Sequence, residues 1–352
     1  MDALETDRHA GRSRDSLARR ALTVSAVALG LAAGLFVVWM ASTALFVIFA
    51  GLLLAVAFDA AAGGLRHLLG GGRRWWLLLV VVLFFVLIAG LLALGGATLV
   101  QQFGQLTSVI EEQVGRLGAY LSDIGIDVEQ EEDGVTPEQL RSIFGGAAQF
   151  LGSVLGAVSN AVVVMFIAVF FAWEPKLYKS ALVSLVPQDR RARLAEVLSR
   201  ARSALAWWMA GQGISMVVIF LLTLGLLMLV GMQLSLLLAV QAGLLAFIPI
   251  LGPFLAGIVI VVVGLAQSPV MALYGLAAYL LIQFVESNIL APIVQERTVR
   301  LAPAFTLSFQ LVFGVLFGFL GLALAVPIAA AGKVFLEELY VKDRLGGFWQ
   351  ED

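Results

Sequence analysis

Apolar residues in this chain come in long blocks that few charged side chains interrupt. Sixty-one per cent of the 352 residues are hydrophobic and 13% are charged, whereas roughly a quarter of an ordinary soluble domain is charged. Several blocks reach the roughly 20 residues that a helix needs to cross a bilayer. The sequence therefore predicts an all-α, polytopic helical membrane protein with about eight membrane segments.

Residues that usually carry enzyme chemistry are scarce. The chain contains no cysteine, and its two histidines, His9 and His67, stand far apart beside arginines. It has no HExxH helix, no phosphate-binding GxxxxGK[ST] loop and no GxSxG elbow. We therefore expect no enzyme activity, no catalytic residues, no metal site and no cofactor.

Charge along the chain predicts its orientation in the cytoplasmic (inner) membrane. Arginines precede the first apolar block, and basic residues dominate 66–74 and 174–204, whereas nine acidic residues lie between Glu111 and Arg141. By the positive-inside rule, the N-terminus and the basic loops are cytoplasmic and the acidic segment is external. No small-residue cleavage site follows the first block before a second span begins, so we expect an uncleaved anchor. The basic loop is interpreted as a solvated helical hairpin, with binding of anionic lipid or nucleic acid as the alternatives.

The expected segments follow from these patterns. The first apolar block, Leu22 to about Phe58, is interpreted as two helices joined by a tight turn at residues 40–43. In chain order we expect a cytoplasmic tail (1–21), spans one to three (22–99), an external acidic helical segment (100–151), span four (152–173), a cytoplasmic basic hairpin (174–204), span five with a transport core of two hairpins and a linking span (205–336), and a C-terminal tail (337–352).

The apolar pieces become shorter after Leu234. Leu234–Ile248 and Phe254–Ala266 each reach only roughly 20 Å as helices, less than the bilayer core. Pro249, Gly252 and Pro253 lie between them. This pattern predicts a re-entrant or broken-helix hairpin with these residues at its tip, facing protein or a wet cavity. Two short tilted spans with a kinked junction are the alternative.

The next apolar stretch, Val270–Leu290, carries an acid well inside a membrane segment. Tyr279, Gln283 and Glu286 recur at helical spacing on one face, and Asn288 follows. A carboxylate within the bilayer is costly and usually faces a pathway or a partner. Glu286 is therefore a candidate binding residue, and a pair with Arg297 at the membrane interface is the alternative.

The last apolar block, Ala304 to about Phe335, would measure roughly 48 Å as one helix. Glycines and one proline, Gly314, Gly318, Gly321 and Pro327, offer places to fold it back. We expect a second hairpin here, with Gly321 and Pro327 at its tip.

The two predicted hairpins share a spacing. Gln241 precedes Gly252 as Gln310 precedes Gly321, and a leucine comes before each glycine. The intervening span places the two hairpins on opposite membrane faces. Inverted repeats of broken helices surround midplane substrate sites in many transporters, so both glutamines are candidate binding residues.

Five stretches of the sequence resemble the autoinducer-2 exporter family. Four of them lie after Leu234, and one lies before it. The matching stretches are Phe247-Ile-Pro-Ile-Leu-Gly-Pro253, Gln283-Phe-Val-Glu-Ser-Asn288 with Ala291-Pro292, Leu301-Ala-Pro303, Gly318-Phe-Leu-Gly-Leu-Ala-Leu-Ala-Val-Pro327, and Phe170-Phe-Ala-Trp-Glu174 through Pro187. The resemblance implies transport without ATP by a homo-oligomer, a pentamer on the resemblance alone. Some relatives export autoinducer-2 and others exchange sodium for protons. Ala302 departs from the histidine that many relatives have there, which puts proton coupling in doubt.

The leading hypothesis is a secondary transporter, a permease or exporter of a small hydrophilic solute such as autoinducer-2 or of ions. Residues from Leu234 to Phe335 would form its moving unit. The predicted substrate- or ion-binding residues are Glu286, Gln283, Asn288, Gln241 and Gln310. The alternatives are a Na+/H+ antiporter-type relative, a non-transporting membrane scaffold or regulator, and a passive channel. Expected partners are membrane lipid, the solute or ion, and further copies of the chain, but no nucleic acid.

Overall fold

The computed structural model describes residues 29–34, 36–86, 158–292 and 301–345, with a few isolated positions outside these ranges. Residues 1–46 and 47–352 form two separate compact units, and the features below belong to the second unit unless stated. The N-terminal tail, most of the predicted external acidic segment and Arg297 lie outside the described residues.

Every regular element among the described residues is helical. The helical segments are residues 29–34 and 36–40 of the first unit, α2 (Ser42–Leu69), a helix over residues 73–86, α5 (Val158–Trp173), α6 (Pro175–Ser184), α7 (Gln188–Leu229), α8 (Ser235–Leu245), α9 (Leu251–Gln267), α10 (Pro269–Val285), η1 (Glu286–Leu290), α12 (Pro303–Leu336), η2 (Glu337–Lys342) and α13 (Asp343–Leu345). The two η segments are π-helical turns that extend α10 and α12.

Four of the described helices are long and apolar enough to cross a membrane. They comprise Ser42–Leu69, Gln188–Leu229, Pro269–Leu290 and Pro303–Lys342. The pair Ala161–Trp173 and Pro175–Ser184 is bent by 82° and adds a fifth only if its two helices are counted as one span. The all-α, polytopic membrane class is thus confirmed, whereas the count of about eight segments remains a prediction.

The structure interrupts the helix at Ala41, within the junction predicted at residues 40–43, and α2 begins at Ser42; a reversal of the chain there stays a prediction. In the first unit, the Ala41 amide donates to the Val37 carbonyl at 2.9 Å, and the Leu45 amide donates to the Ala41 carbonyl at 3.0 Å. These are helical i to i−4 bonds on either side of Ala41. The stretch contains no glycine or proline that would break a helix.

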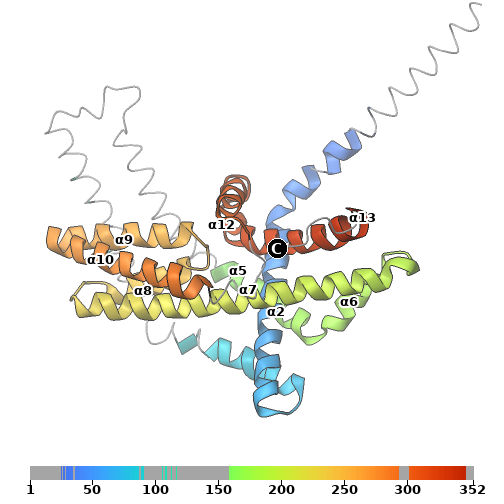
Figure 1. Cartoon of the computed structure of the whole chain (residues 1–352), viewed down its shortest axis with the longest axis horizontal. Helices are drawn as coiled ribbons and strands as arrows, with labels where there is room; N and C mark the ends of the chain where they lie inside the picture. Colours follow the sequence, from blue (N-terminus) through green and yellow to red (C-terminus); the bar gives the residue numbers. More distant parts are fainter. Residues whose placement is uncertain are drawn as a thin grey trace, which may run out of the picture. The chain divides into compact units, whose positions relative to one another are not determined.

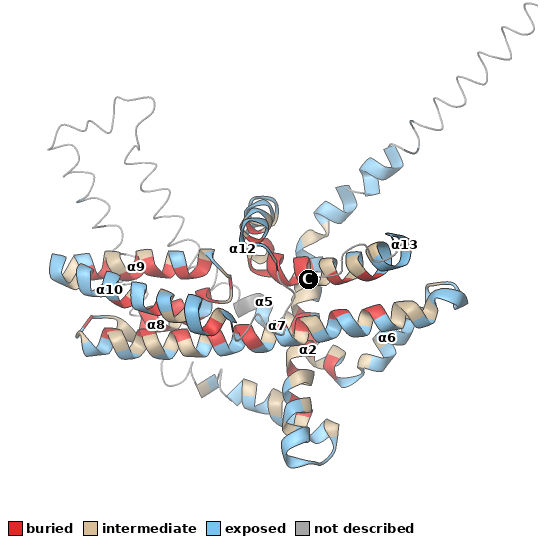
Figure 2. Cartoon of the chain, viewed as in Figure 1, coloured by how far each residue is buried: buried red, intermediate tan, exposed pale blue. Residues whose placement is uncertain are grey.

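Helices α7, α8, α9 and α10 pack together around the larger apolar core (Figure 1). Buried residues of α7 recur every three or four positions, among them Gln212, Ser215, Ile219, Thr223 and Leu227. Figure 2 shows buried residues as stripes and exposed ones on the remaining faces. Many exposed side chains of α10 are large and apolar, including Leu273, Leu280 and Phe284. Such surfaces suit contact with lipid.

A second apolar cluster joins α2, the helix over residues 73–86 and α5. Asp59 of α2 lies beside it and pairs with Arg73, whose Nε donates to Oδ1 at 2.8 Å, and with Arg202 of α7. Arg73 also donates from Nη2 to the Ala172 carbonyl at 2.8 Å. These bonds join α2 to α7 and to the helix over residues 73–86, which in turn is bonded to α5.

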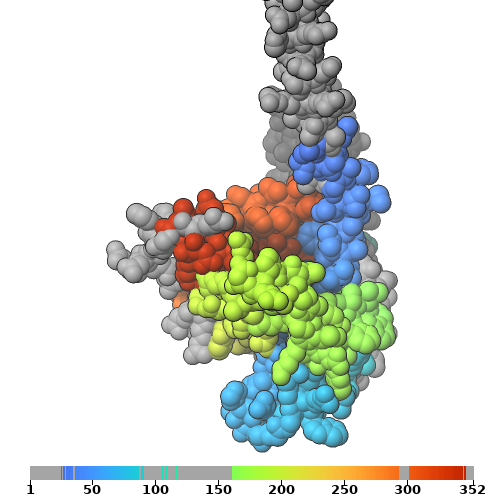
Figure 3. Space-filling model, turned by 90° about the vertical axis from the view of Figure 1, so that its right-hand side faces the viewer, coloured from blue at the N-terminus to red at the C-terminus, as the bar shows by residue number. Residues whose placement is uncertain are grey.

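The C-terminal turn η2 is bound to the first half of α7 by ion pairs. Glu338 accepts from Arg193 Nη2 at 3.0 Å, Arg200 Nη1 at 2.7 Å and Lys342 Nζ at 2.6 Å. Asp343 also pairs with Arg193, at 3.0 Å. Figure 3 shows the C-terminal helices, in red, against the yellow-green first half of α7. We call Glu338 and its three cationic partners the C-terminal clamp.

The first half of α12 carries four phenylalanines at i, i+4 spacing. The ring centroids of Phe305 and Phe309 are 5.5 Å apart, those of Phe309 and Phe313 4.3 Å, and those of Phe313 and Phe317 5.5 Å. Ring pairs at these distances attract one another. The rings therefore form a continuous ladder along one face of this half-helix.

Candidate functional site

The chain breaks between α8 and α9, where the sequence predicts the first hairpin tip. Ile250 has φ 69° and ψ −63°, and the Leu251 amide donates to the Pro249 carbonyl at 2.8 Å. These values define a γ-turn, which is strained for a β-branched residue at positive φ. Strained backbone clusters at functional sites, so this tip is a candidate site on geometric grounds.

Gly252 lets α9 begin directly against the end of α8. A Cβ at this position would overlap the Leu245 carbonyl oxygen. Only glycine allows so close a backbone approach. The predicted tip residues Pro249, Gly252 and Pro253 thus lie at or just after the break.

A sharp turn also interrupts α12, but at Gly318. This residue has φ 66° and ψ −149°, a conformation that glycine adopts readily. Beyond the turn, a Cβ at Gly321 would overlap the Phe313 carbonyl oxygen, eight residues earlier. Pro327 was predicted at the tip, but it lies buried inside the second half of α12. The turn falls at Gly318 because positive φ is inaccessible to proline.

Two glutamines, Gln241 and Gln310, occupy matching positions in the helical segments that precede the two breaks. Gln241 on α8 is 5% exposed and Gln310 on α12 is 0% exposed. Among the described residues, neither amide nitrogen nor amide oxygen of either side chain has a hydrogen-bond partner. Buried polar groups are nearly always hydrogen-bonded, and an unpaired one costs about 1–3 kcal/mol. These two amides are therefore exceptions that require an explanation.

Helix α7 contributes polar residues that the sequence analysis did not identify. Gln212 is buried, and its Nε2 donates to the carbonyl of Ala246, in the turn after α8. Thr223 is fully buried, and its hydroxyl has no partner in the described part of the chain. Gln212, Ser215 and Thr223 fall on one face of a helix, and this spacing is the sequence signal that could have identified them.

The polar face of α10 is turned towards α9 over part of its length. A Cβ at Gly257 of α9 would lie 2.6 Å from the Tyr279 ring. Glu286 begins the π-helical turn η1, and its Oε2 is buried without a hydrogen-bond partner in the described ranges. Single π-helical turns often occur at functional sites.

The remaining predicted residues of this helix are bonded locally. Gln283 Nε2 lies 3.3 Å from Ser287 Oγ, and Asn288 Nδ2 donates to the Phe284 carbonyl at 2.9 Å. Asn288 is exposed. In the described segments, no hydrogen bond joins Gln241, Gln310 and Glu286, and no three acidic or histidine side chains form a metal site. The structure thus shows three separate buried polar positions.

These features define a class: polytopic α-helical membrane proteins with discontinuous helices and buried polar groups beside the breaks. The family profile described as AI-2E family transporter matches residues 29–341. The chain therefore belongs to the AI-2E transporter family, as its sequence motifs predict.

Three relatives are named as putative transport proteins. YueF of Bacillus subtilis is 26% identical over 191 residues, 53% of this chain and 51% of YueF. YrrI of the same organism is 25% identical over 199 residues, 54% of this chain and 56% of YrrI. MT0215 of Mycobacterium tuberculosis is 26% identical over 270 residues, 69% of this chain and 71% of MT0215. The alignments therefore span only about half the length of the two Bacillus proteins.

Proposed function

We propose that this chain is a secondary transporter that moves a small hydrophilic solute or an ion across the cytoplasmic membrane. The observation that carries the proposal is the pair of buried glutamines, Gln241 and Gln310. Each lies eleven residues before a glycine that packs against the preceding helix. Broken helices with unsatisfied polar groups surround the substrate in many transporters.

The chemistry of these side chains fits a polar, hydrogen-bonding solute. An amide offers both donors and acceptors, so it can replace water around hydroxyl or carbonyl groups. Glu286 would bind a coupling cation or proton, because it is the buried carboxylate of its span. Autoinducer-2 is one solute of this kind, and sodium/proton exchange is the alternative activity.

The orientation and assembly belong to the same proposal. The N-terminus and the basic segment 174–204 face the cytoplasm, the acidic segment faces outward, and several copies form a homo-oligomer. Gln130→Cys and Gln188→Cys, made singly in this cysteine-free chain, test the orientation. An impermeant thiol reagent added to sealed cells should label only the first, and labelling of the second would overturn the map.

Matched substitutions test the role of the glutamines. Gln241→Met and Gln310→Met keep approximate size and remove the amide. Each should reduce solute flux in proteoliposomes by about tenfold or more, the scale of one lost hydrogen bond to substrate. Melting temperatures should stay equal or rise, because an unsatisfied buried amide is replaced by an apolar group. Gln267→Met is the control, since Gln267 accepts from the Gln233 amide at 3.1 Å, away from both turns.

The flux assay separates the competing functions. Proteoliposomes receive a panel of labelled solutes with imposed pH or sodium gradients. Saturable uptake that a gradient drives uphill supports the transporter. No flux over a wide panel would favour a scaffold or regulator, and discrete conductance steps in single-channel recordings would favour a channel.

A further inference from the structure

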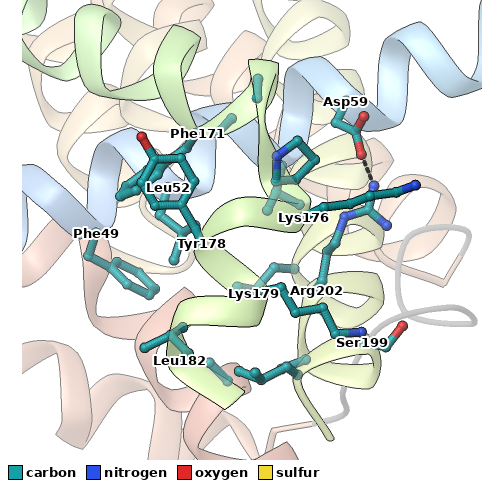
Figure 4. Close-up of a pocket in the computed structure, with 18 of the residues that line it drawn as sticks. Phe49, Leu52, Asp59, Phe171, Lys176, Tyr178, Lys179, Leu182, Ser199 and Arg202 are labelled. Carbon is teal, nitrogen blue, oxygen red and sulfur yellow. Dashed lines mark hydrogen bonds and ion pairs between the residues drawn. The ribbon is translucent and has the colours of Figure 1, made fainter. Parts of the chain in front are cut away.

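A cavity of about 380 Å³ opens between α2, α5, α6, α7 and the end of α12, away from both helix breaks (Figure 4). None of the candidate binding residues lines it. Phe49, Leu52, Phe171 and Leu182 are among its many apolar lining residues. The cavity is therefore a separate feature from the candidate transport site.

Polar side chains gather on one side of this cavity. Figure 4 shows Lys176, Lys179, Ser199 and Arg202 together, with the aromatic and aliphatic groups on the other side. Asp59 lies on the polar side, but it is already paired with Arg73 and Arg202. The cavity thus has an apolar part and a cationic part.

The two lysines have no carboxylate partner in the part of the chain that the structure describes. Among the described residues, neither Lys176 nor Lys179 forms a hydrogen bond or an ion pair, and both side chains are exposed. A second hollow of about 740 Å³ shares Lys176 and adds Arg73 and Arg74, with Glu174 as its carboxylate. Cations therefore outnumber carboxylates where the two hollows meet.

Helix α6 provides these lysines and has the character of an interfacial helix. It follows α5 across a bend of 82° and contains no buried residue. It combines lysines with exposed Leu177 and Leu182. Amphipathic helices of this composition lie in the headgroup region of a membrane.

We propose that these two hollows bind one anionic phospholipid. An acyl chain fills the apolar cavity, and the phosphate headgroup lies over Lys176 and Lys179. Charge complementarity favours this occupant, because basic clusters at the membrane surface attract anionic headgroups. Where α6 lies on the cytoplasmic side, as in the proposed orientation, the lipid comes from the inner leaflet.

The test uses purified, full-length, delipidated protein and native mass spectrometry. Phosphatidylglycerol or phosphatidylcholine is titrated into wild type, Lys176→Ala/Lys179→Ala and the control Arg66→Ala/Arg190→Ala. The control removes the same charge from exposed positions outside the cavity. We expect tight phosphatidylglycerol binding that the lysine variant weakens by about tenfold or more, while the control changes it by less than about twofold.

Two results would overturn the proposal. One is equal binding of both lipids, since the cations would then select nothing. The other is a lysine variant that loses oligomer mass while its lipid binding stays unchanged, which would make the cavity a contact between copies. Leu182→Asp provides a second variant at an exposed lining position. It should weaken binding because it places a charge in the apolar part of the cavity, where the acyl chain lies, and its melting temperature reports folding independently.

Discussion

Two π-helical turns of this protein each carry a glutamate with a buried carboxylate group or oxygen. One of these glutamates is paired with cations, and the other has no partner among the described residues. Glu338 in η2 is 5% exposed and accepts from three cationic side chains. Glu286 in η1 has a buried oxygen with no hydrogen-bond partner among the described residues. A charge that is fully paired stabilises a contact, whereas an unpaired one costs free energy unless something else binds it. The comparison therefore favours an architectural role for Glu338, whereas binding at Glu286 remains a prediction.

The largest expected effect is on transport. Glu286→Gln keeps the shape of the side chain and removes its charge, so solute flux should lose its dependence on an imposed pH or sodium gradient. The melting temperature should stay the same or rise, because a buried charge without a partner is removed. Flux in proteoliposomes and thermal unfolding measure the two quantities. Unaltered rate and gradient dependence would remove Glu286 from the site and leave the two helix breaks as candidates.

The matching change in the C-terminal clamp should act on stability. Glu338→Gln leaves three cations without their shared carboxylate and should lower the free energy of unfolding by about 1–3 kcal/mol. Intrinsic tryptophan fluorescence should show a melting temperature lower by several degrees. Solute flux per folded molecule should still depend on the imposed pH or sodium gradient. A variant that melts normally but loses gradient dependence would reverse the roles of the two carboxylates.

Removal of one clamp cation should have a smaller effect. Arg200→Gln leaves Arg193 and Lys342 on Glu338. We expect a decrease in melting temperature that is smaller than that of Glu338→Gln. In the double variant, the two decreases should not add, because both substitutions break the same pair. Additive decreases would show that Arg200 stabilises the protein by another route.

A change in salt concentration should produce the smallest difference in melting temperature between wild type and the variants. The Debye length falls from about 10 Å at 0.1 M to about 3 Å at 1 M salt, so the exposed parts of the clamp are screened. Over this range of salt concentration, the melting temperature of wild type should decrease slightly more than that of Glu338→Gln. Glu286→Gln should respond as wild type does, and an equal salt response in all three proteins would contradict the electrostatic role of the clamp.

The sequence predicted features that depend on neighbouring residues. The break around Pro249 and the buried carboxylate oxygen of Glu286 follow from apolar length, proline and glycine positions, and helical spacing. The matched glutamine positions were also visible as spacing, and the structure adds their burial. Their binding role remains a prediction.

Features that depend on distant residues were not predicted. Glu338 pairs with residues 138 and 145 positions away, and no local pattern specifies that contact. The backbone angles show that α12 turns at Gly318. The sequence alone could not select this residue, because several nearby glycines and Pro327 were also possible positions for the turn. The π-helical turns have no recognised sequence signal in the residues that form them. The hydrogen bond from Gln212 to Ala246 required the packing of α7 on α8.

The phenylalanine ladder of α12 has a mechanical consequence. A half-helix that these ring contacts keep straight, from Pro303 to Phe317, would be a rod of roughly 22 Å, at 1.5 Å per residue. Gly318 at its end would be the pivot, because it has non-helical backbone angles inside α12 and glycine permits backbone rotation that other residues resist. A rotation of about 10° at this pivot displaces the far end by about 4 Å, which is comparable to the width of one side chain. Small torsional changes at a single residue are thereby amplified at the opposite end of the rod.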